Sequence, residues 1–320
     1  MILIITKEND THADIVEKHL RAMNEDFVRI DTGWLPNRIQ ITLRVIQGVT
    51  SVAFHQDGKT TDITNPNGIW FRKPSDTQIS SALSKETADF VQRECQHLWS
   101  YVWEAISSNN WINHPRMNVR ANNRVLQWKT AWTLGFKIPD TTVTNSPASV
   151  CSVWENRHEE FAVKVLNQTV IEKNGKMYSM YTKLLDAEIM EEIARVELCP
   201  IILQPYIKKK REWRVTVVGN KVFSCIINSQ SSDRANLDWR RYDMDNVPHL
   251  AGDLPKDIEN KCLALTKELG LCFGAIDLIE KPTGEFVFLE INPNGQWAWV
   301  EALTGLPISH AIAEQLAMKI

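Results

Sequence analysis

Apolar and polar positions at the start of the chain predict short buried strands alternating with an amphipathic helix. The run Ile2–Ile5 predicts a buried strand, and positions 11–23 predict a helix that begins at Asp10 and Thr11. The apolar run Phe27–Ile30 predicts a second strand. A β-α-β opening is typical of a parallel sheet, and the missing GxGxxG motif argues against a dinucleotide site.

The same reading extends along the rest of the chain. Strands are predicted at 39–45, 51–55, 69–71, 141–144, 161–166 and 201–207. Helices are predicted at 83–107, 122–134, 186–196, 256–269 and 309–319. Hairpin turns are predicted at Asp57-Gly58, Asn174-Gly175, Gly219-Asn220 and 282–284. We therefore expect an α/β (α+β) protein with an N-terminal unit at 1–116, a central unit at 117–207 and a C-terminal unit at 208–320.

Composition narrows the class of protein. Hydrophobic residues make up 43% and charged residues 23% of the 320 positions, an ordinary globular balance. The net charge of −3 gives no reason to expect a nucleic-acid or anionic-membrane partner. No segment is apolar for long enough to predict a signal peptide or a membrane span. The six cysteines form no CxxC pair, which favours reduced thiols in a cytoplasmic protein. Trp132, like Trp99 and Trp103, is expected to pack in a core.

A candidate metal face lies near the end of the chain. If 281–284 form a hairpin loop, Asp277 faces Phe288 across the two strands. Side chains alternate along a strand, so Glu290 and Asn292 then point the same way as Asp277, while Leu278, Leu289 and their apolar neighbours form the opposite, buried face. Two carboxylates and an amide suit Mg²⁺ bound with phosphates. The alternative is a solvent-facing hairpin with incidental acids.

Three further stretches suit an anionic ligand. Lys164 lies in an apolar strand, where a lysine needs an anionic partner unless it faces solvent at an edge. The stretch 204–207 ends a strand, where freed backbone groups could bind an adenine edge, although proline also simply ends strands. Arg214 shares a face with Glu212 and could grip a phosphate or carboxylate, or form a salt pair. The run 208–211 is expected to be a solvated turn.

In this order along the chain, these elements resemble the ATP-grasp superfamily. The resemblance covers about 115–320, and LEINPNG at 289–295 is its most specific stretch. It implies an ATP-grasp fold preceded by an N-terminal Rossmann-like, pre-ATP-grasp domain.

More narrowly, the chain resembles the graspetide (microviridin-type) peptide macrocyclases. The resemblance is carried by ILIITKENDTHAD with RIDT at 29–32, IWFRKP at 69–74, INSQ at 227–230 with DWR at 238–240, and EINPNGQW at 290–297. That family joins Asp or Glu side chains of a ribosomal precursor peptide to Ser, Thr or Lys side chains, giving lactones or lactams. The partners implied are the leader and core of such a peptide, and a homodimer is expected.

The resemblance also implies roles for individual residues. With ATP and Mg²⁺ as cofactors, Asp277, Glu290 and Asn292 would hold the metal. The residues implied for the nucleotide are Lys164 at the phosphates, Gln204, Pro205, Tyr206 and Ile207 at the adenine, and either Arg124 or Lys129 as the first phosphate cation. The residues implied for catalysis are Lys164, Arg214 and Arg240, with Arg72 and Lys73 as further candidates for receiving the substrate carboxylate. The loop after Lys164 departs from the Gly-rich flap of many ATP-grasp ligases.

A helix in the central unit is the candidate leader-docking site. Glu188, Glu191, Glu192 and Arg195 would lie along one stripe of the predicted helix 186–196 and could hold an arginine of a helical leader. The alternative is a solvated acidic face with a Glu191–Arg195 pair.

The implied reaction phosphorylates a substrate carboxylate, releases ADP, and lets a hydroxyl or amine displace phosphate. One alternative is a RimK-like ligase that adds an amino acid to a peptide or small molecule. Another is a non-catalytic ATP- or peptide-binding regulator, against which the complete Asp277, Glu290 and Asn292 set argues.

Overall fold

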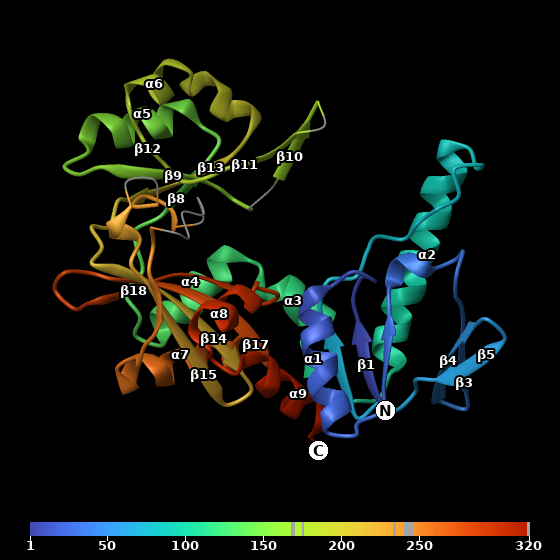
Figure 1. The fold of residues 1–320 in the computed structure, drawn as a ribbon. Coiled ribbons are helices and arrows are strands. Elements are labelled where there is room, and N and C mark those ends of the chain that lie inside the picture. The colour runs from blue at the N-terminus through green and yellow to red at the C-terminus, as the bar shows by residue number, and fades with distance from the viewer. Residues whose placement is uncertain (168–169, 175, 233–234, 240–245, 319–320) are drawn as a thin grey trace.

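The computed structural model describes residues 1–167, 170–174, 176–232, 235–239 and 246–318 (Figure 1). It consists of an N-terminal α/β unit, a C-terminal sheet beside it, and a smaller sheet at the far end of the C-terminal one. Among the described residues, no helix combines the length and apolar character needed to cross a membrane.

The N-terminal sheet is parallel, as the opening pattern predicts. Its strands stand in the order β2-β1-β6-β7, with β1 at Ile2–Ile5, β2 at Phe27–Ile30, β6 at Gly68–Phe71 and β7 at Trp111–Ile112. Ile2 and Ile4 pack on the side of α1 (Thr11–Ala22), whereas Leu3 and Ile5 pack on the side of α2 (Lys85–Ala105). The four strand residues are apolar because helices cover both faces of the sheet.

A small antiparallel sheet packs beside α2. It contains β3 (Gln40–Ile46), β4 (Val49–Gln56) and β5 (Lys59–Asp62). The turn predicted at Asp57-Gly58 is confirmed, and both residues have positive φ, at 51° and 74°. Such a turn matches the right-handed twist of the two strands it joins.

The central sheet is antiparallel and has the order β12-β9-β13-β8. Its strands are β8 (Thr142–Thr144), β9 (Phe161–Val165), β12 (Lys183–Leu184) and β13 (Ile201–Pro205), with β10 (Val170–Lys173) and β11 (Lys176–Ser179) forming a separate hairpin. Its core contains Val150 from helix α5 (Pro147–Asn156) and Leu203 from β13.

The helix predicted at 186–196 is wrong in extent. Helix α6 runs only from Ala187 to Glu191, and the chain continues as a 3₁₀ helix, η2, at Ile193–Leu198. Ile193 and Val196, three positions apart, both pack into the central core. A 3₁₀ turn has three residues per turn, so it places both side chains on the sheet, which an α-helix does less well.

The C-terminal sheet is antiparallel, with the order β16-β15-β14-β17-β18. Its strands are β14 (Arg211–Val218), β15 (Lys221–Ile227), β16 (His249–Ala251), β17 (Phe273–Glu280) and β18 (Phe286–Asn292). One face is covered by α7 (Lys256–Glu268), α3 (Pro115–Ala121) and α4 (Arg124–Thr133). The helix predicted at 122–134 begins two residues later, because the side chain of Asn123 caps it by accepting from the Leu126 N–H.

Helix α4 packs on the C-terminal sheet. It turns Gln127, Trp128 and Ala131 toward that sheet and leaves Trp132 61% exposed, so the prediction that Trp132 packs in a core is wrong. We propose that the central unit is narrower than 117–207 and begins near β8.

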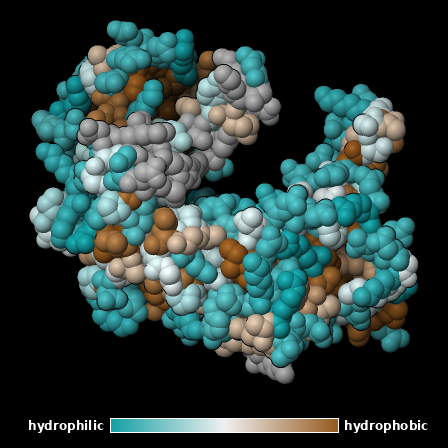
Figure 2. Space-filling model, viewed as in Figure 1, coloured by the Kyte–Doolittle hydropathy of each residue, from teal (hydrophilic) through white to brown (hydrophobic). Residues whose placement is uncertain are grey.

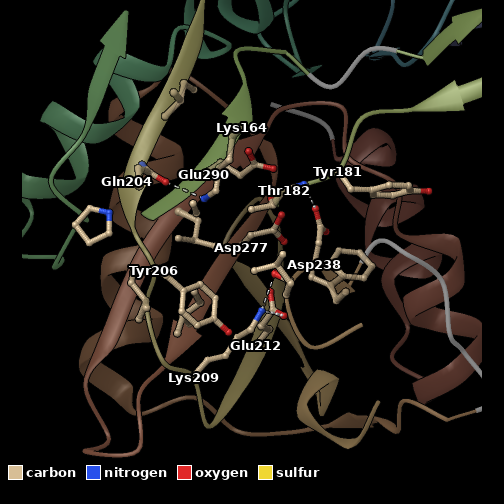
Figure 3. Close-up of a pocket in the computed structure, with 18 of the residues that line it drawn as sticks. Lys164, Tyr181, Thr182, Gln204, Tyr206, Lys209, Glu212, Asp238, Asp277 and Glu290 are labelled. Carbon is tan, nitrogen blue, oxygen red and sulfur yellow. Dashed lines mark hydrogen bonds and ion pairs between the residues drawn. The ribbon is translucent and has the colours of Figure 1, made fainter. Parts of the chain in front are cut away.

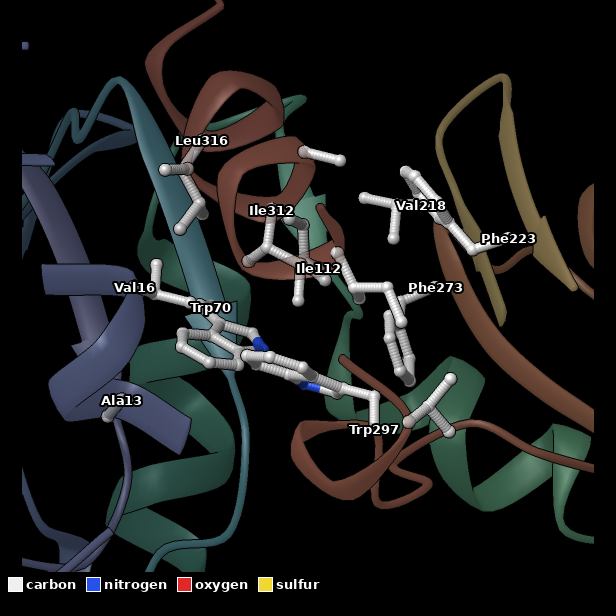
Figure 4. Close-up of a cluster of buried hydrophobic side chains, with 14 of the residues drawn as sticks. Ala13, Val16, Trp70, Ile112, Val218, Phe223, Phe273, Trp297, Ile312 and Leu316 are labelled. Carbon is white, nitrogen blue, oxygen red and sulfur yellow. The ribbon is translucent and has the colours of Figure 1, made fainter. Parts of the chain in front are cut away.

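The N-terminal unit and the C-terminal sheet share one hydrophobic core (Figure 4). The last two helices, α8 (Ala298–Thr304) and α9 (Ile308–Ala317), return the chain to the N-terminal unit, and α9 packs against α1. Trp70 of β6, Ile312 of α9 and the fully buried Trp297 meet Phe273 of β17 in this core. The helix predicted at 309–319 is confirmed apart from its ends, and Lys319 lies outside the described residues.

His12 lies at the edge of this shared core. Its ring stands perpendicular to that of Trp297, 4.8 Å between centroids. Burial and the nearby Arg72 guanidinium lower the pKa of His12 to about 4. A neutral histidine therefore belongs to the folded state.

This pKa predicts a loss of stability in acid that depends on His12. In the unfolded chain His12 takes up a proton near its ordinary pKa of 6.5, whereas the folded chain resists it until about pH 4. The contribution is present above pH 6.5, and about 2 kcal/mol of it is lost by pH 5. Urea denaturation at pH 7 and pH 5 should show a smaller decrease for His12→Gln than for the wild type. The exposed-site control His97→Gln should keep the wild-type decrease, and an equal decrease in all three proteins would contradict the assignment.

Candidate active site

A cavity lies between the central sheet and the C-terminal sheet. Lys164 and Gln204 line it from the central sheet, and Asp277 and Glu290 line it from the C-terminal sheet (Figure 3). Its lining combines apolar and aromatic side chains with several charged groups, which is typical of a small-molecule site. Figure 2 shows a wide concavity between the central lobe and the N-terminal unit.

The β17–β18 hairpin brings the two carboxylates together. Asp277 pairs directly with Glu290, and Ala275 pairs with Asn292, so the three side chains share one face as expected. The predicted register, with Asp277 opposite Phe288, is wrong, because a bulge shifts the pairing between Asp277 and Leu278.

The bulge also exchanges two apolar side chains between the faces of the hairpin. Leu278 pairs with Phe288, and both lie in the core, whereas Phe288 was expected on the metal face. Leu289 is the extra residue, and it lines the cavity instead of the core. A bulge places two residues of one strand opposite a single residue of its partner, so the alternation of faces shifts by one residue beyond it.

Each carboxylate of the pair has an arginine partner. Arg214 of β14 lies directly opposite Asp277 and donates to its Oδ1 at 2.8 Å. Arg124, the first residue of α4, forms an ion pair with Glu290. Adjacent carboxylates repel unless cations lie close, so these arginines stabilise the pair. Of the two candidates for the first phosphate cation, Arg124 lines the cavity, and Lys129 is exposed outside the residues that line it.

The donor set fits a hard divalent cation. Asp277 and Glu290 supply carboxylate oxygens, and Asn292 ends β18 with an exposed side chain whose Oδ1 accepts from the Asn294 N–H at 2.9 Å. Oxygen ligands of this kind suit Mg²⁺, which usually keeps several waters or phosphate oxygens besides one or two carboxylates. Among the residues that the structure describes, no cluster of three or more His, Cys, Asp or Glu side chains offers a competing site.

Lys164 approaches this face from the central sheet. Its Nζ donates to Gln204 Oε1 at 2.8 Å, and Gln204 Nε2 in turn donates to Thr141 Oγ1 at 2.8 Å. Lys164 is half-buried, so the alternative of a fully solvated edge lysine does not hold. This chain of contacts directs a cation into the cavity.

The stretch after β13 forms one wall of the cavity. Pro205, Tyr206 and Ile207 all line it, and the Tyr206 N–H donates to Glu160 O at 2.7 Å. Burial raises the pKa of the Tyr206 phenol, which therefore stays protonated at neutral pH. With Leu289, these side chains could cover the face of a flat ring.

The floor of the cavity contains a buried ion pair that the sequence reading missed. Lys209 donates to Glu212 Oε1 at 2.7 Å, and Ser229 Oγ donates to the same oxygen at 2.8 Å. Both charged residues are buried, so the prediction that 208–211 is a solvated turn is wrong for Lys209. The pair could have been predicted from the sequence, because the acidic Glu212 follows Lys209 by three residues.

Asp238 lies on the same side of the cavity. It accepts from the Thr182 N–H at 3.0 Å and lines the cavity beside Trp239 (Figure 3). Arg240, the neighbouring catalytic candidate, lies outside the described residues.

The remaining sequence candidates lie away from the cavity. Arg72 is 2% exposed and contacts the loop after β18, where it donates to Asn294 O at 2.6 Å, and its neighbour Lys73 is exposed. Glu188 and Glu191 are exposed on α6 in the central unit. Because α6 ends at Glu191, the predicted single stripe of acids is wrong, and Arg195 pairs with Glu192 at 2.6 Å.

Comparison with known proteins agrees with this geometry. A family model described as the MvdD pre-ATP grasp domain matches residues 1–119. A sequence comparison with curated proteins gives no match. Among solved structures, a RiPP-associated ATP-grasp ligase from Chryseobacterium gregarium is 27% identical with a TM-score of 0.89, covering 98% of this chain and 96% of that chain.

Two macrocyclases from Microcystis aeruginosa MRC are also similar. MdnC is 28% identical with a TM-score of 0.85, covering 98% of each chain, and MdnB is 26% identical with a TM-score of 0.81, covering 99% of each chain. The likeness extends over the N-terminal unit, the cavity and the metal face. The chain is therefore similar, over almost its whole length, to ATP-grasp ligases of the microviridin, or graspetide, type.

Proposed function

We propose that this chain is an ADP-forming ligase that uses ATP and Mg²⁺ to close rings in a ribosomal precursor peptide. It would activate Asp or Glu side chains of the peptide and join them to Ser, Thr or Lys side chains as esters or amides. The observation that carries the proposal is the Asp277–Glu290 pair facing Lys164 across the cavity between the two sheets.

The contents of related structures support this substrate. The Chryseobacterium ligase was solved with ADP and with a leader and a core peptide, and MdnC was solved with its precursor peptide MdnA. This chain matches both over 98% of its length. The wide concavity between the central lobe and the N-terminal unit leaves room for a peptide.

We assign the nucleotide to the wall and floor of the cavity. The stretch 205–207 would hold the adenine, and Lys164 and Arg124 would contact the phosphates. Asp277, Glu290 and Asn292 would hold Mg²⁺, which when bound neutralises the charge that develops on the transferred phosphoryl group. Since Lys164 lies on β9 of the central sheet and Arg124 begins helix α4, they can grip the phosphates from two sides.

The chemistry follows from the weakness of a carboxylate as an electrophile. Phosphorylation of the substrate carboxylate gives an acyl phosphate and ADP, and attack by a hydroxyl or amine then releases phosphate. Arg214 lies against Asp277 at the metal face, where a guanidinium can orient an incoming carboxylate. We keep Arg240 as a second candidate for that role.

The RimK-like alternative differs in where the nucleophile comes from. In a ring-forming enzyme the nucleophile belongs to the same peptide as the activated carboxylate, so its effective concentration is high. A hydroxyl can then compete although it is a weak nucleophile.

Intact-mass analysis of the precursor tests the proposed reaction. The peptide encoded beside the gene should lose one water per turnover with enzyme, ATP and Mg²⁺, and its chain length should not change. Dehydrations that revert in mild base indicate lactones, and those that survive indicate lactams. A control without ATP should leave the mass unchanged. A mass gain equal to an added amino acid would establish the RimK-like alternative instead.

We also propose that the exposed acids of the α6–η2 region dock the leader. Glu188 and Glu191 on α6 offer an anionic surface to an arginine of the leader, and Glu192 is already paired with Arg195. This surface lies in the central unit, away from the metal face (Figure 1).

Charge reversal separates leader docking from nucleotide binding. The double variant Glu188→Lys/Glu191→Lys should weaken leader binding by about tenfold, because each lost exposed ion pair contributes up to about 1 kcal/mol. Calorimetry should find its ADP affinity unchanged. The matched variant Asp89→Lys/Glu94→Lys, on α2, should bind the leader like wild type. Wild-type leader affinity in the α6 variant would reject the docking site.

We further propose a homodimer in the cytoplasm. Val45, Ile46 and Val49 at the tip of the β3–β4 hairpin are 62%, 64% and 72% exposed, and such a cluster suits contact with a second copy. The six cysteines are free thiols, as expected in a reducing compartment.

A further inference from the structure

The loop that follows the metal strand is held from the N-terminal unit. This loop, 293–297, is here called the exit loop. Arg72, at the end of β6, donates from Nη1 to Asn294 O at 2.6 Å and from Nη2 to Gln296 Oε1 at 3.4 Å. Arg72 is 2% exposed, so its guanidinium is shielded from water, which strengthens the hydrogen bonds that it donates.

A second N-terminal side chain holds the start of the exit loop. Asn113, just after β7, donates from Nδ2 to Pro293 O and to Phe273 O, each at 2.9 Å. Its Oδ1 accepts from the backbone N–H groups of Cys272 and Phe273 at 2.7 and 2.8 Å. One buried amide thus ties the end of β18 to the beginning of β17, the two strands that carry the metal face.

The exit loop is connected in turn to the metal face. Arg214 donates from Nη2 to Gln296 O at 3.2 Å and from Nη1 to Asp277 Oδ1 at 2.8 Å. A Cβ at Gly295 would lie 2.3 Å from that of Ala275 and 3.2 Å from Arg214 Nη2. The loop therefore packs directly on the strand and on the arginine that hold Asp277.

We propose that Arg72 is a positioning residue for the metal face, which it orients through the exit loop, Gln296 and Arg214. It would not receive the substrate carboxylate, because its side chain is buried and both of its terminal nitrogens already face loop acceptors. The inference rests on the proposed function only in taking Asp277, Glu290 and Asn292 as metal ligands. The N-terminal unit would then supply part of the support of the site, beyond any contact it makes with a substrate.

The geometry requires an arginine at this position. The two nitrogens Nη1 and Nη2 diverge from a planar group and reach a backbone carbonyl and a side-chain amide at once. A lysine has a single terminal nitrogen and could maintain only one of the two contacts in the same place. Partners that orient metal ligands in this indirect way commonly affect metal affinity by about 10- to 100-fold.

Metal titration of two variants tests the proposal. Arg72→Lys should raise the Mg²⁺ concentration for half-maximal AMPPNP binding by about tenfold, and Gln296→Ala by a smaller factor of about three. Binding of AMPPNP without metal should change by less than about twofold in both, since the adenine wall lies on the central unit. Gln296 is exposed, so Gln296→Ala should fold. Its Mg²⁺ dependence therefore tests the proposal even if Arg72→Lys does not fold.

Arg38→Lys serves as the matched control. Arg38 is an arginine of the same N-terminal unit, but it is exposed and pairs with Glu8 at 2.9 Å. The control should keep the wild-type Mg²⁺ dependence. The proposal is overturned if both test variants keep the wild-type Mg²⁺ dependence, or if they lose metal-free and metal-bound nucleotide affinity equally. The proposed function fails separately, if the wild type binds Mg²⁺ and AMPPNP normally but never dehydrates the precursor peptide.

Discussion

Two carboxylates held side by side on one sheet face are the constraint on which the rest of this site depends. Asp277 and Glu290 are direct partners in the β17–β18 ladder, so the backbone hydrogen bonds hold them together whether or not a cation is present. Like charges this close are costly unless positive groups surround them. Arg214 and Arg124 provide that charge from two different elements, and a divalent cation would add to it. The arrangement thus presents two carboxylates whose mutual repulsion is offset by two arginines.

The shared core explains why the N-terminal unit belongs to this machinery. Trp297, at the end of the exit loop, is fully buried among residues of both the N-terminal unit and the C-terminal sheet. Arg72 and Asn113 attach the same loop from the side of the parallel sheet. The central sheet, in contrast, meets the C-terminal sheet across the cavity, where Lys164 faces the acids. The wall that carries the acids is therefore packed on a core shared with the N-terminal unit, and the opposite wall belongs to the central sheet.

Side-chain alternation made the metal face predictable from sequence, because Asp277, Glu290 and Asn292 follow the period of two that a half-buried strand imposes. The bulge at Leu289 was not predictable, since it depends on how the hairpin closes in three dimensions. Yet the acids still share a face, because Asp277 pairs two residues beyond the predicted Phe288, and a shift of two residues along a strand preserves the face. Lys209 and Arg72 show another limit. From sequence, a charged residue next to a strand is predicted to be solvated or to bind substrate. In the folded chain Lys209 and Arg72 are instead buried, and each donates to a backbone carbonyl far along the chain, that of Leu237 or of Asn294. The predicted extent of the acidic helix, 186–196, was wrong for a related reason, because packing into the central core favours a 3₁₀ helix after Glu191.

The most direct test of the central claim is the rate of Mg²⁺-dependent ADP release by Asp277→Asn, measured with precursor peptide beside a thermal melt. The substitution keeps the size of the side chain and removes its charge, so the fold should persist. If Asp277 holds the metal at the phosphates, the rate should decrease by about 10²- to 10³-fold while the melt stays cooperative. A wild-type rate from the folded variant would contradict the account.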